Sequence, residues 1–290
     1  MATRDVLGPA VAGSWYPADR HTLAATVDGL LTSADASSPH VTGGARAAIA
    51  PHAGFAYSGA VAARALRSIS GPNVRRVVLL GPSHYFGFEG AAIPARSRAL
   101  RTPLGDVPID GDATARLCAS PGFRADDRVF EPEHALESEV PFLQRLFGER
   151  FSLVPVLVGG GATRQDAARV AAAVEPLLDD TTRLVVSSDF THFGPRFGYV
   201  PFEDDVPARL RELDLGAFRA IEAGDAAAFA HYVDATGTTI CGRRAIDVLL
   251  RLSWGAGGGE ALAYDTSGRM TGSWDHSVSY AAIAFPAAAS

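Results

Sequence analysis

Two short segments of this chain are apolar at every position, and they constrain its fold more than any other feature. Residues 77–80 read Val-Val-Leu-Leu and residues 184–186 read Leu-Val-Val. Successive side chains of a strand point to opposite faces of a sheet, so such runs are typical of central strands that are covered on both faces. The sequence therefore predicts a layered α/β fold, with one sheet flanked by helices.

The remaining segments alternate between short aliphatic runs and longer Ala-rich stretches with helical spacing. We expect strands at residues 47–50, 76–80, 151–158, 183–187 and 278–285. Helices are expected at residues 23–33, 59–69, 137–147, 164–178, 206–223, 225–233 and 243–253. No Pro- or Ser-rich linker divides the 290 residues, so the prediction is a single domain spanning residues 1–290.

The basic residues exclude several classes of function. All 26 are arginine, and lysine is absent, so neither a P-loop nor a pyridoxal Schiff base can form. The net charge of −6 comes without any clustered basic stretch, which argues against a nucleic-acid partner. Catalytic groups must therefore come from His, Cys, Asp, Glu, Tyr or Arg.

The cysteines and the start of the chain indicate a cytoplasmic protein. Cys118 and Cys241 are too few for a disulfide framework and have no CxxC partner, which favours a reducing compartment. Residues 1–15 lack the basic start and apolar run of a signal peptide. No stretch reaches about 18 uninterrupted apolar residues, so no membrane association is expected.

Three histidines follow apolar strands at the point where each strand is expected to end. His52 comes directly after the strand at 47–50, His84 follows the strand at 76–80, and His192 follows the strand at 183–187. Loops beyond the carboxyl ends of parallel strands line the ligand crevice of an open α/β sheet. A single such histidine would be interpreted as structural, but three in the same topological position predict a shared site.

Cys241 extends this prediction towards a metal. A helix is expected to begin near Arg243, which would place the sulfur at a helix N-terminus, where the dipole and Arg243 and Arg244 favour a thiolate. A thiolate with neutral imidazoles suits Fe(II), Zn(II) or copper. The alternative for Cys241 is a small buried hydrophobic residue.

A second polar cluster contains His134 and Glu137. On a helix these two residues would share a face at i, i+3. The carboxylate of Glu137 would then fix the orientation of a histidine at the site. An acidic helix start that complements the helix dipole is an equally good interpretation.

Eight motifs in order along the chain resemble those of the Memo family. They are AGSWYP at 12–17, APHAGFAYSG at 50–59, GPSH at 81–84, RTPLG at 101–105, EH at 133–134, PVLVG at 155–159, SSDFTH at 187–192 and TICGR at 239–243. The resemblance runs over nearly the whole chain. It implies a fold similar to the class III, LigB-type extradiol dioxygenases, which hold non-haem Fe(II) with two histidines and a carboxylate.

The resemblance also implies a set of metal ligands. His52 and His84 take the places of the metal-binding pair, and Cys241 takes the place of the third ligand. A thiolate in place of a carboxylate changes the donor strength and the redox potential of iron, so ring cleavage does not follow from the resemblance alone. Glu139 stands where animal members are expected to have a histidine, so the resemblance implies no role for it.

Further residues take roles from the same resemblance. His192 matches the acid/base histidine of the dioxygenases, Asp189 lies beside it to orient it, and Trp15 stands at the rim of the pocket. Eukaryotic members are described as iron-binding, redox-linked proteins that bind phosphotyrosine peptides. Prokaryotic members often accompany a radical-SAM enzyme, which is therefore an expected functional partner.

Three functions follow as hypotheses from these residues. The first is a mononuclear non-haem iron oxidoreductase, dioxygenase-like, in which His192 moves protons on a small-molecule substrate. The second is a binding module for a peptide or an anionic ligand, with Arg243, Arg244 and Trp15 supplying charge and an aromatic wall. The third is a zinc-dependent hydrolase with the same ligands.

Overall fold

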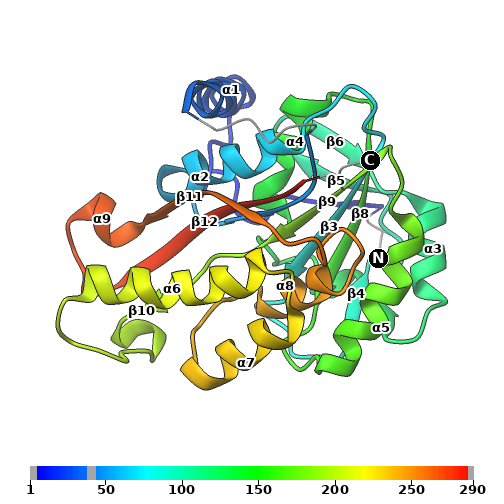
Figure 1. The fold of residues 1–290 in the computed structure, drawn as a ribbon. Helices are drawn as coiled ribbons and strands as arrows, with labels where there is room; N and C mark the ends of the chain where they lie inside the picture. Colours follow the sequence, from blue (N-terminus) through cyan, green and yellow to red (C-terminus); the bar gives the residue numbers. More distant parts are fainter. Residues whose placement is uncertain (1–4, 38–43, 287–290) are drawn as a thin grey trace.

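The centre of the structure, a computed structural model that describes residues 5–37 and 44–286, is a row of parallel strands (Figure 1). In spatial order the row is β2 (Ala45–Ala50), β9 (Thr182–Ser187), β3 (Arg76–Pro82) and β8 (Ser152–Val158). All four strands were predicted to within two residues. Because they are parallel and adjacent, their carboxyl ends lie at the same edge of the sheet.

Antiparallel strands extend the row on both sides. β12 (Ser277–Pro286) pairs with β2, and it also pairs with β11 (Glu260–Thr266) and β10 (His192–Phe193). On the other side β4 (Ala91–Ile93) pairs antiparallel with β8 and parallel with β7 (Phe123–Ala125). The sequence predicted β12 but not the other four, since two- and three-residue strands and the mixed polarity of β11 give no clear alternation.

A small separate sheet lies against the first. It consists of β1 (Val6–Leu7), β5 (Ala99–Thr102) and β6 (Gly105–Pro108), in the order β1-β5-β6. β5 and β6 form a tight antiparallel hairpin whose turn includes Gly105 at φ +130°, a conformation that favours glycine. The strands are too short to be recognised from sequence periodicity.

Helices cover both faces of the large sheet, as the wholly apolar runs predicted. One face carries α1 (Arg20–Ser37), α2 (Phe55–Ser68) and α4 (Val140–Phe147), which pack with Val77 and Leu79. The other face packs Val78 and Leu80 against a second group of helices. That group comprises α3 (Gly111–Cys118), α5 (Arg164–Val174), α6 (Val206–Glu222), α7 (Ala226–Thr236) and α8 (Arg243–Leu250).

Alternate residues of β3 thus belong to two different hydrophobic cores. Val77 and Leu79 pack in one core and Val78 and Leu80 in the other, and each of these four side chains is fully buried. Burial of one such side chain contributes about 1.5–3 kcal/mol, so the register of these strands is firmly set. A last short helix, α9 (Ser267–Thr271), joins β11 to β12. Among the described residues, no helix is long and apolar enough to cross a membrane.

Candidate metal centre

Two of the predicted histidines meet at the carboxyl edge of the parallel strands. β2 ends at Ala50 and β3 ends at Pro82, and each strand is followed two residues later by His52 or His84. The two imidazole rings lie edge to face with their centroids 5.3 Å apart. His52 is buried, whereas the side chain of His84 is 27% exposed and gives the site an open side.

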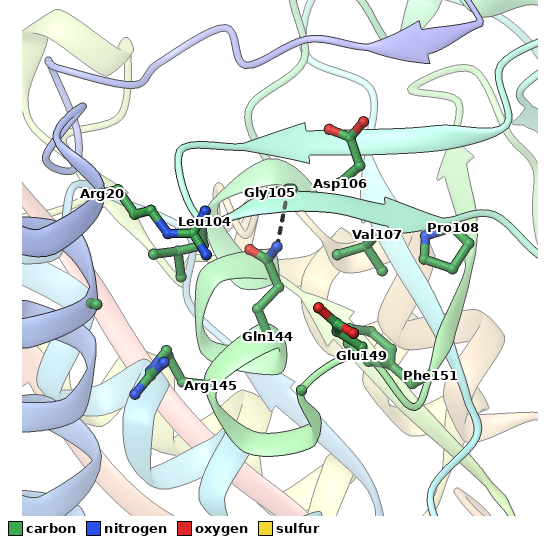
Figure 2. A pocket seen from close by; sticks show the side chains of 12 residues that line it. Arg20, Leu104, Gly105, Asp106, Val107, Pro108, Gln144, Arg145, Glu149 and Phe151 are labelled. Carbon is green, nitrogen blue, oxygen red and sulfur yellow. Dashed lines mark hydrogen bonds between the residues drawn. The ribbon is translucent and has the colours of Figure 1, made fainter.

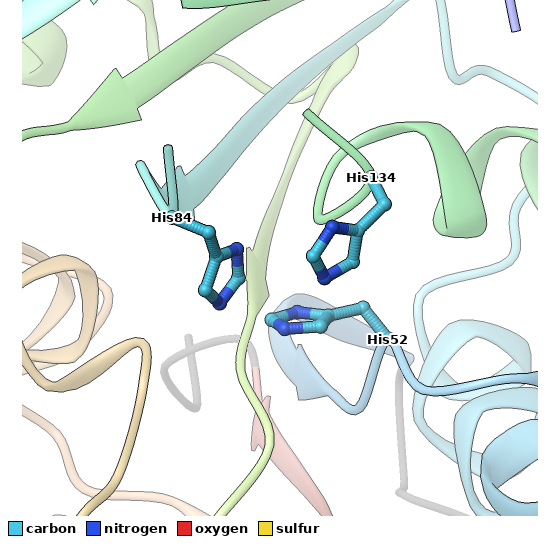
Figure 3. Close-up of side chains that lie close together, drawn as sticks. All are labelled: His52, His84 and His134. Atoms are coloured by element: carbon cyan, nitrogen blue, oxygen red, sulfur yellow. The ribbon is translucent and has the colours of Figure 1, made fainter. Parts of the chain in front are cut away.

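His134 completes a group of three imidazoles, which we call the three-His group (Figure 3). It comes from the connection between two short 3-10 helices at Asp127–Val129 and Glu137–Glu139. Its ring stacks on His84 with the centroids 4.5 Å apart and lies 5.6 Å from that of His52. One nitrogen from each ring lies within 4.8 Å of the corresponding atoms of the other two, which is close enough for one metal ion to bind all three.

The surroundings of His52 and His134 keep these two rings uncharged. Burial, followed by the charges of neighbouring imidazoles, lowers the pKa of His52 well below its usual value of 6.5. Burial and the charge of His84 lower the pKa of His134 to about 4. A neutral imidazole has a free lone pair, and this is the form that binds a metal.

Acid is expected to destabilise the metal-free protein through His134. Because its folded pKa of about 4 lies below the usual 6.5, the unfolded chain takes up this proton first as the pH falls. Stability is therefore fully present above pH 6.5 and is lost towards pH 4, with about 2 kcal/mol lost between pH 7 and pH 5. Urea unfolding with a chelator present measures the loss. Between pH 7 and pH 5, the free energy of unfolding of His134→Asn should fall by about 2 kcal/mol less than that of wild type. Equal losses in the two proteins would contradict the assignment.

Glu133 holds the ring of His84 and the backbone of both His84 and His134. Its buried carboxylate accepts the backbone N–H of His84 at 2.7 Å and the Nδ1–H of the same residue at 2.8 Å. It also accepts the backbone N–H groups of His134 and Ala135, each at 3.0 Å. Burial raises the pKa of Glu133, but the hydrogen bonds from His84 and the backbone outweigh it and leave the pKa lowered. The carboxylate is thus ionised, and His84 keeps its proton on Nδ1 and its lone pair on Nε2.

Ser187 and Asp189, at the end of β9, support His52. The Nδ1 of His52 lies 2.7 Å from the hydroxyl oxygen of Ser187. The carboxylate of Asp189 accepts the backbone N–H of His52 at 2.9 Å. Burial raises the pKa of Asp189 to about 7, although the backbone donors of His52 and Ala53 lower it in part. With Nδ1 engaged, Nε2 is the nitrogen of His52 that is available to a metal.

Cys241 borders this group on the side of His52. Its sulfur lies 3.4 Å from Nε2 of His52 and accepts the backbone N–H of Asp189 at 3.2 Å. Helix α8 begins at Arg243, as predicted, so Cys241 does precede a helix N-terminus. Gly242 lets this turn approach closely, because a Cβ there would lie 2.4 Å from the Cβ of Ser188.

The predicted thiolate is not the state of Cys241 in the metal-free protein. Burial, and then the charge of Asp189, raise the pKa of the thiol, and the helix N-terminus does not compensate. The sulfur is therefore a thiol that can donate to the free lone pair of His52. A metal that bound it would displace its proton.

His192 lies near the three-His group, close enough that its charge contributes to the lowered pKa of His52. Two backbone carbonyls hold its ring. Its Nδ1 lies 3.0 Å from the carbonyl oxygen of Phe190 and 3.1 Å from that of Thr239. Carbonyls only accept, so Nδ1 carries the proton and Nε2 is a free base. The sequence assigned this orienting role to Asp189. The carboxylate of Asp189 instead accepts the backbone N–H of His52, and its backbone N–H donates to the sulfur of Cys241.

Trp15 forms an aromatic wall beside the three-His group. Its ring lies 4.3 Å from that of His134, centroid to centroid, and Tyr85 lies 5.9 Å from His134 on another side. The segment that carries Trp15 is fastened by Glu137, whose carboxylate accepts the backbone N–H groups of Ala10 and Val11. Tyr16 donates its hydroxyl to the same carboxylate. Glu137 therefore positions Trp15, whereas the sequence had associated it with the orientation of His134.

Arg243 is half-buried at the first position of α8, where burial lowers the pKa of its guanidinium. Its neighbour Arg244 is also half-buried. Both arginines follow Cys241 directly, so they supply positive charge on the α8 side of the site. The structure gives neither of them a contact with the three-His group.

A separate hollow of about 500 Å³ lies between the start of α1, the β5–β6 hairpin and the end of α4 (Figure 2). Gln144 closes one side by donating to the carbonyl of Gly105 at 3.0 Å. The charges at its edge are partly paired already, since Arg145 bonds Asp28 and Asp106 bonds Arg101. The three-His group does not line this hollow, so we do not assign the chemistry to it.

Several residues of the site escaped the sequence reasoning. Glu133 and Ser187 were seen only as parts of motifs, and Tyr85 was not considered. The dipeptide Glu133-His134 was the one signal in the sequence for these supporting residues, because a carboxylate near a metal-site histidine commonly accepts a hydrogen bond from it. The sequence could not show that the connection carrying residues 133 and 134 lies against the carboxyl ends of the parallel strands.

Comparison with known proteins gives a consistent result. The sequence model of the family described as "Memo-like protein" matches residues 8–284. The protein memo-1 homolog of Caenorhabditis elegans is 37% identical over 286 residues, covering 93% of this chain and 79% of the worm protein. Protein MEMO1 of Danio rerio is 36% identical and that of Homo sapiens 33%, each covering 82% of this chain and 81% of the relative.

An uncharacterized protein from Escherichia coli K12 aligns in structure with a TM-score of 0.47 and 14% identity, covering 73% of this chain and 86% of that one. The family match extends over nearly all of the chain and includes each histidine of the three-His group. The identities to the curated relatives exceed 30% over most of both sequences. The chain belongs to the Memo family.

Proposed function

We propose that this protein binds one transition-metal ion at the three-His group and acts as a mononuclear non-haem iron oxidoreductase. The observation that carries the proposal is the convergence of His52, His84 and His134, whose nitrogens lie within 4.8 Å of one another. Burial keeps His52 and His134 neutral. Fe(II) is the first candidate because the family resemblance implies it, and the donor set also suits Zn(II) or copper.

The residues fit a metal in a second respect. Histidines that bind metals almost always use the other ring nitrogen to contact a carboxylate, a carbonyl or another polar group. His84 does so through Glu133, and His52 does so through Ser187. In both rings Nδ1 is thereby engaged and Nε2 remains for the metal.

The third ligand is either the nitrogen of His134 or the sulfur of Cys241. The geometry favours His134, whose ring lies close to both other rings. Cys241, which the family resemblance implies, lies 3.4 Å from His52 and must first lose its proton. Cobalt(II) substitution separates the two, since only a thiolate ligand gives a sulfur-to-metal charge-transfer band that Cys241→Ser abolishes.

The chain's own residues would then bind the substrate and move protons. Bound Fe(II) would supply the one-electron chemistry that activates dioxygen. His192, with its free Nε2, would take a proton from the substrate. Trp15 and the exposed Tyr85 would hold an apolar or aromatic part of the substrate against the open side at His84.

Anaerobically purified protein is expected to carry about one equivalent of iron and to consume oxygen in the presence of a reductant. Elemental analysis measures the first, and an oxygen electrode measures the second. Both signals should fall when a chelator removes the metal. Full occupancy by zinc, together with less than stoichiometric iron, would contradict the redox proposal.

One observation favours zinc hydrolysis as the second candidate. Three imidazoles with an open side are also the ligand set of some catalytic zinc sites, in which a bound water becomes the nucleophile. The two functions differ in their need for oxygen. Turnover of an ester or amide by the zinc-loaded protein, without oxygen uptake, would select the hydrolase.

A further inference from the structure

A buried hydrogen-bond cluster lies behind His52, on the side away from the site. Its centre is the hydroxyl oxygen of Ser187, which is fully buried and has three hydrogen-bond neighbours in the described part of the chain. They are the carbonyl oxygen of Ala135 at 2.6 Å, Nδ1 of His52 at 2.7 Å and Oε1 of Glu139 at 3.0 Å. Each distance is that of a hydrogen bond, so each of the three contacts needs one proton.

Counting protons assigns the direction of all three bonds. A hydroxyl has one proton to donate and two lone pairs that accept. The carbonyl of Ala135 can only accept, so the proton of Ser187 must point to it. The hydroxyl oxygen then accepts in the other two bonds, and the protons in those bonds belong to His52 Nδ1 and to the carboxyl group of Glu139.

The other oxygen of Glu139 points to the same protonation state independently. Glu139 is fully buried, and among the described residues Oε2 has no hydrogen-bond partner. An ionised carboxylate without donors is costly in such a place, whereas a neutral acid needs only its single O–H satisfied. Burial raises the pKa of Glu139 well above its usual value, and the charge of Asp189 adds to the effect.

We propose that Glu139 is a neutral carboxylic acid that acts as a positioning residue for His52 through Ser187. Glu139 donates to Ser187, Ser187 donates to Ala135, and the remaining lone pair of Ser187 receives the Nδ1–H of His52. The hydroxyl then has no proton left to give to Nδ1. His52 is therefore held in the tautomer whose Nε2 faces the metal, and this consequence for metal binding rests on the proposed function.

Ionisation of Glu139 would disturb this arrangement. A carboxylate would compete with the Ala135 carbonyl for the single proton of Ser187, so one of the two acceptors would be left unpaired. It would also place a second negative charge near Asp189. The neutral acid avoids both costs and leaves Ser187 one fixed role towards His52.

Two measurements on the metal-free full-length protein test the protonation directly. Long-range ¹H–¹⁵N correlation spectra are expected to show His52 as the Nδ1–H tautomer, with the signals assigned by their loss in His52→Ala. The infrared difference spectrum of wild type minus Glu139→Gln is expected to contain the carbonyl band of a protonated carboxylic acid. An Nε2–H tautomer, or only carboxylate bands in the difference, would overturn the proposal.

Metal titration tests the positioning role. Glu139→Leu is expected to lower the affinity for Zn(II) about 10-fold, as for loss of other supporting partners of a ligand. Glu139→Gln should restore most of it, because an amide N–H can donate to Ser187 as the acid does. A Gln variant as weak as the Leu variant would overturn the role.

Asp247→Asn is the matched control, because Asp247 is another buried acid, in α8, with one oxygen that has no hydrogen-bond partner among the residues described. It should leave the affinity unchanged. The spectroscopic measurements need no metal, and the tautomer is read in wild type, so an Nε2–H tautomer of His52 would overturn the proposal even if a variant at position 139 fails to fold. If wild type bound no metal, the proposed function would fail while the tautomer and the acid proton could still be found.

Discussion

Replacing His84 with alanine is expected to lower the affinity for Fe(II) or Zn(II) by more than about 100-fold. Loss of a partner that supports a metal ligand costs about 10- to 100-fold, so loss of the ligand itself costs more. His84 belongs both to the three-His group and to the ligand set implied by the family resemblance. A competitive titration against a chromophoric chelator measures the change.

The variant should remain folded, which makes the result interpretable. The side chain of His84 is 27% exposed, and Glu133 keeps backbone donors from residues 84, 134 and 135. His231→Ala is the matched control, since His231 is an exposed histidine in α7. The control should bind metal like wild type. Wild-type affinity in His84→Ala would show that the metal lies elsewhere.

The positions of His52 and His84 could be predicted from the sequence because each follows an apolar strand directly. Once the strands are parallel and adjacent, elementary sheet geometry brings the residues after them to one edge. The same argument predicted the buried core, in which Val77 and Leu79 face one set of helices and Val78 faces the other. Local pattern and tertiary structure agree here, so short stretches of sequence were sufficient.

His134 could not be placed in the same way. It lies in a connection with 3-10 turns and no periodicity. Its position depends on contacts that its neighbours Glu133 and Ala135 make with the distant residues His84 and Ser187. The protonation of Cys241 was missed for a related reason. A helix N-terminus is visible in sequence, but the depth of burial that raises the pKa of the thiol depends on packing across the whole fold.

Under the proposed function, these contacts would prepare the three-His group for a metal. Burial alone would leave neutral imidazoles free to adopt either tautomer. Glu133 and Ser187 remove that freedom, since each engages Nδ1 of one ring and leaves Nε2 for the site. The strand ends set the distance between the rings of His52 and His84. The connection through residues 133–139 carries His134, and its Glu133 and Glu139 act on the ring protons of His84 and, through Ser187, of His52.

Glu133→Gln is therefore expected to affect both stability and metal binding. The carboxylate accepts four hydrogen bonds, including both donors of His84, and an amide has only one oxygen to offer them. Its NH₂ group would face N–H donors in a buried place. We expect a loss of about 3 kcal/mol in the free energy of unfolding. The affinity for metal should fall by about 10- to 100-fold, because His84 loses the partner that fixes its proton.

Urea unfolding of the metal-free protein and chelator competition measure the two effects separately. Glu149→Gln removes the same charge at an exposed position near the end of α4 and should change neither. Because Glu133 accepts from Nδ1 of His84, its replacement has a further consequence. In Glu133→Gln the ring of His84 should be found in both tautomers, whereas wild type holds the Nδ1–H form. If the variant were as stable as wild type and bound metal equally well, the hydrogen bonds of Glu133 would not be what orients the three-His group.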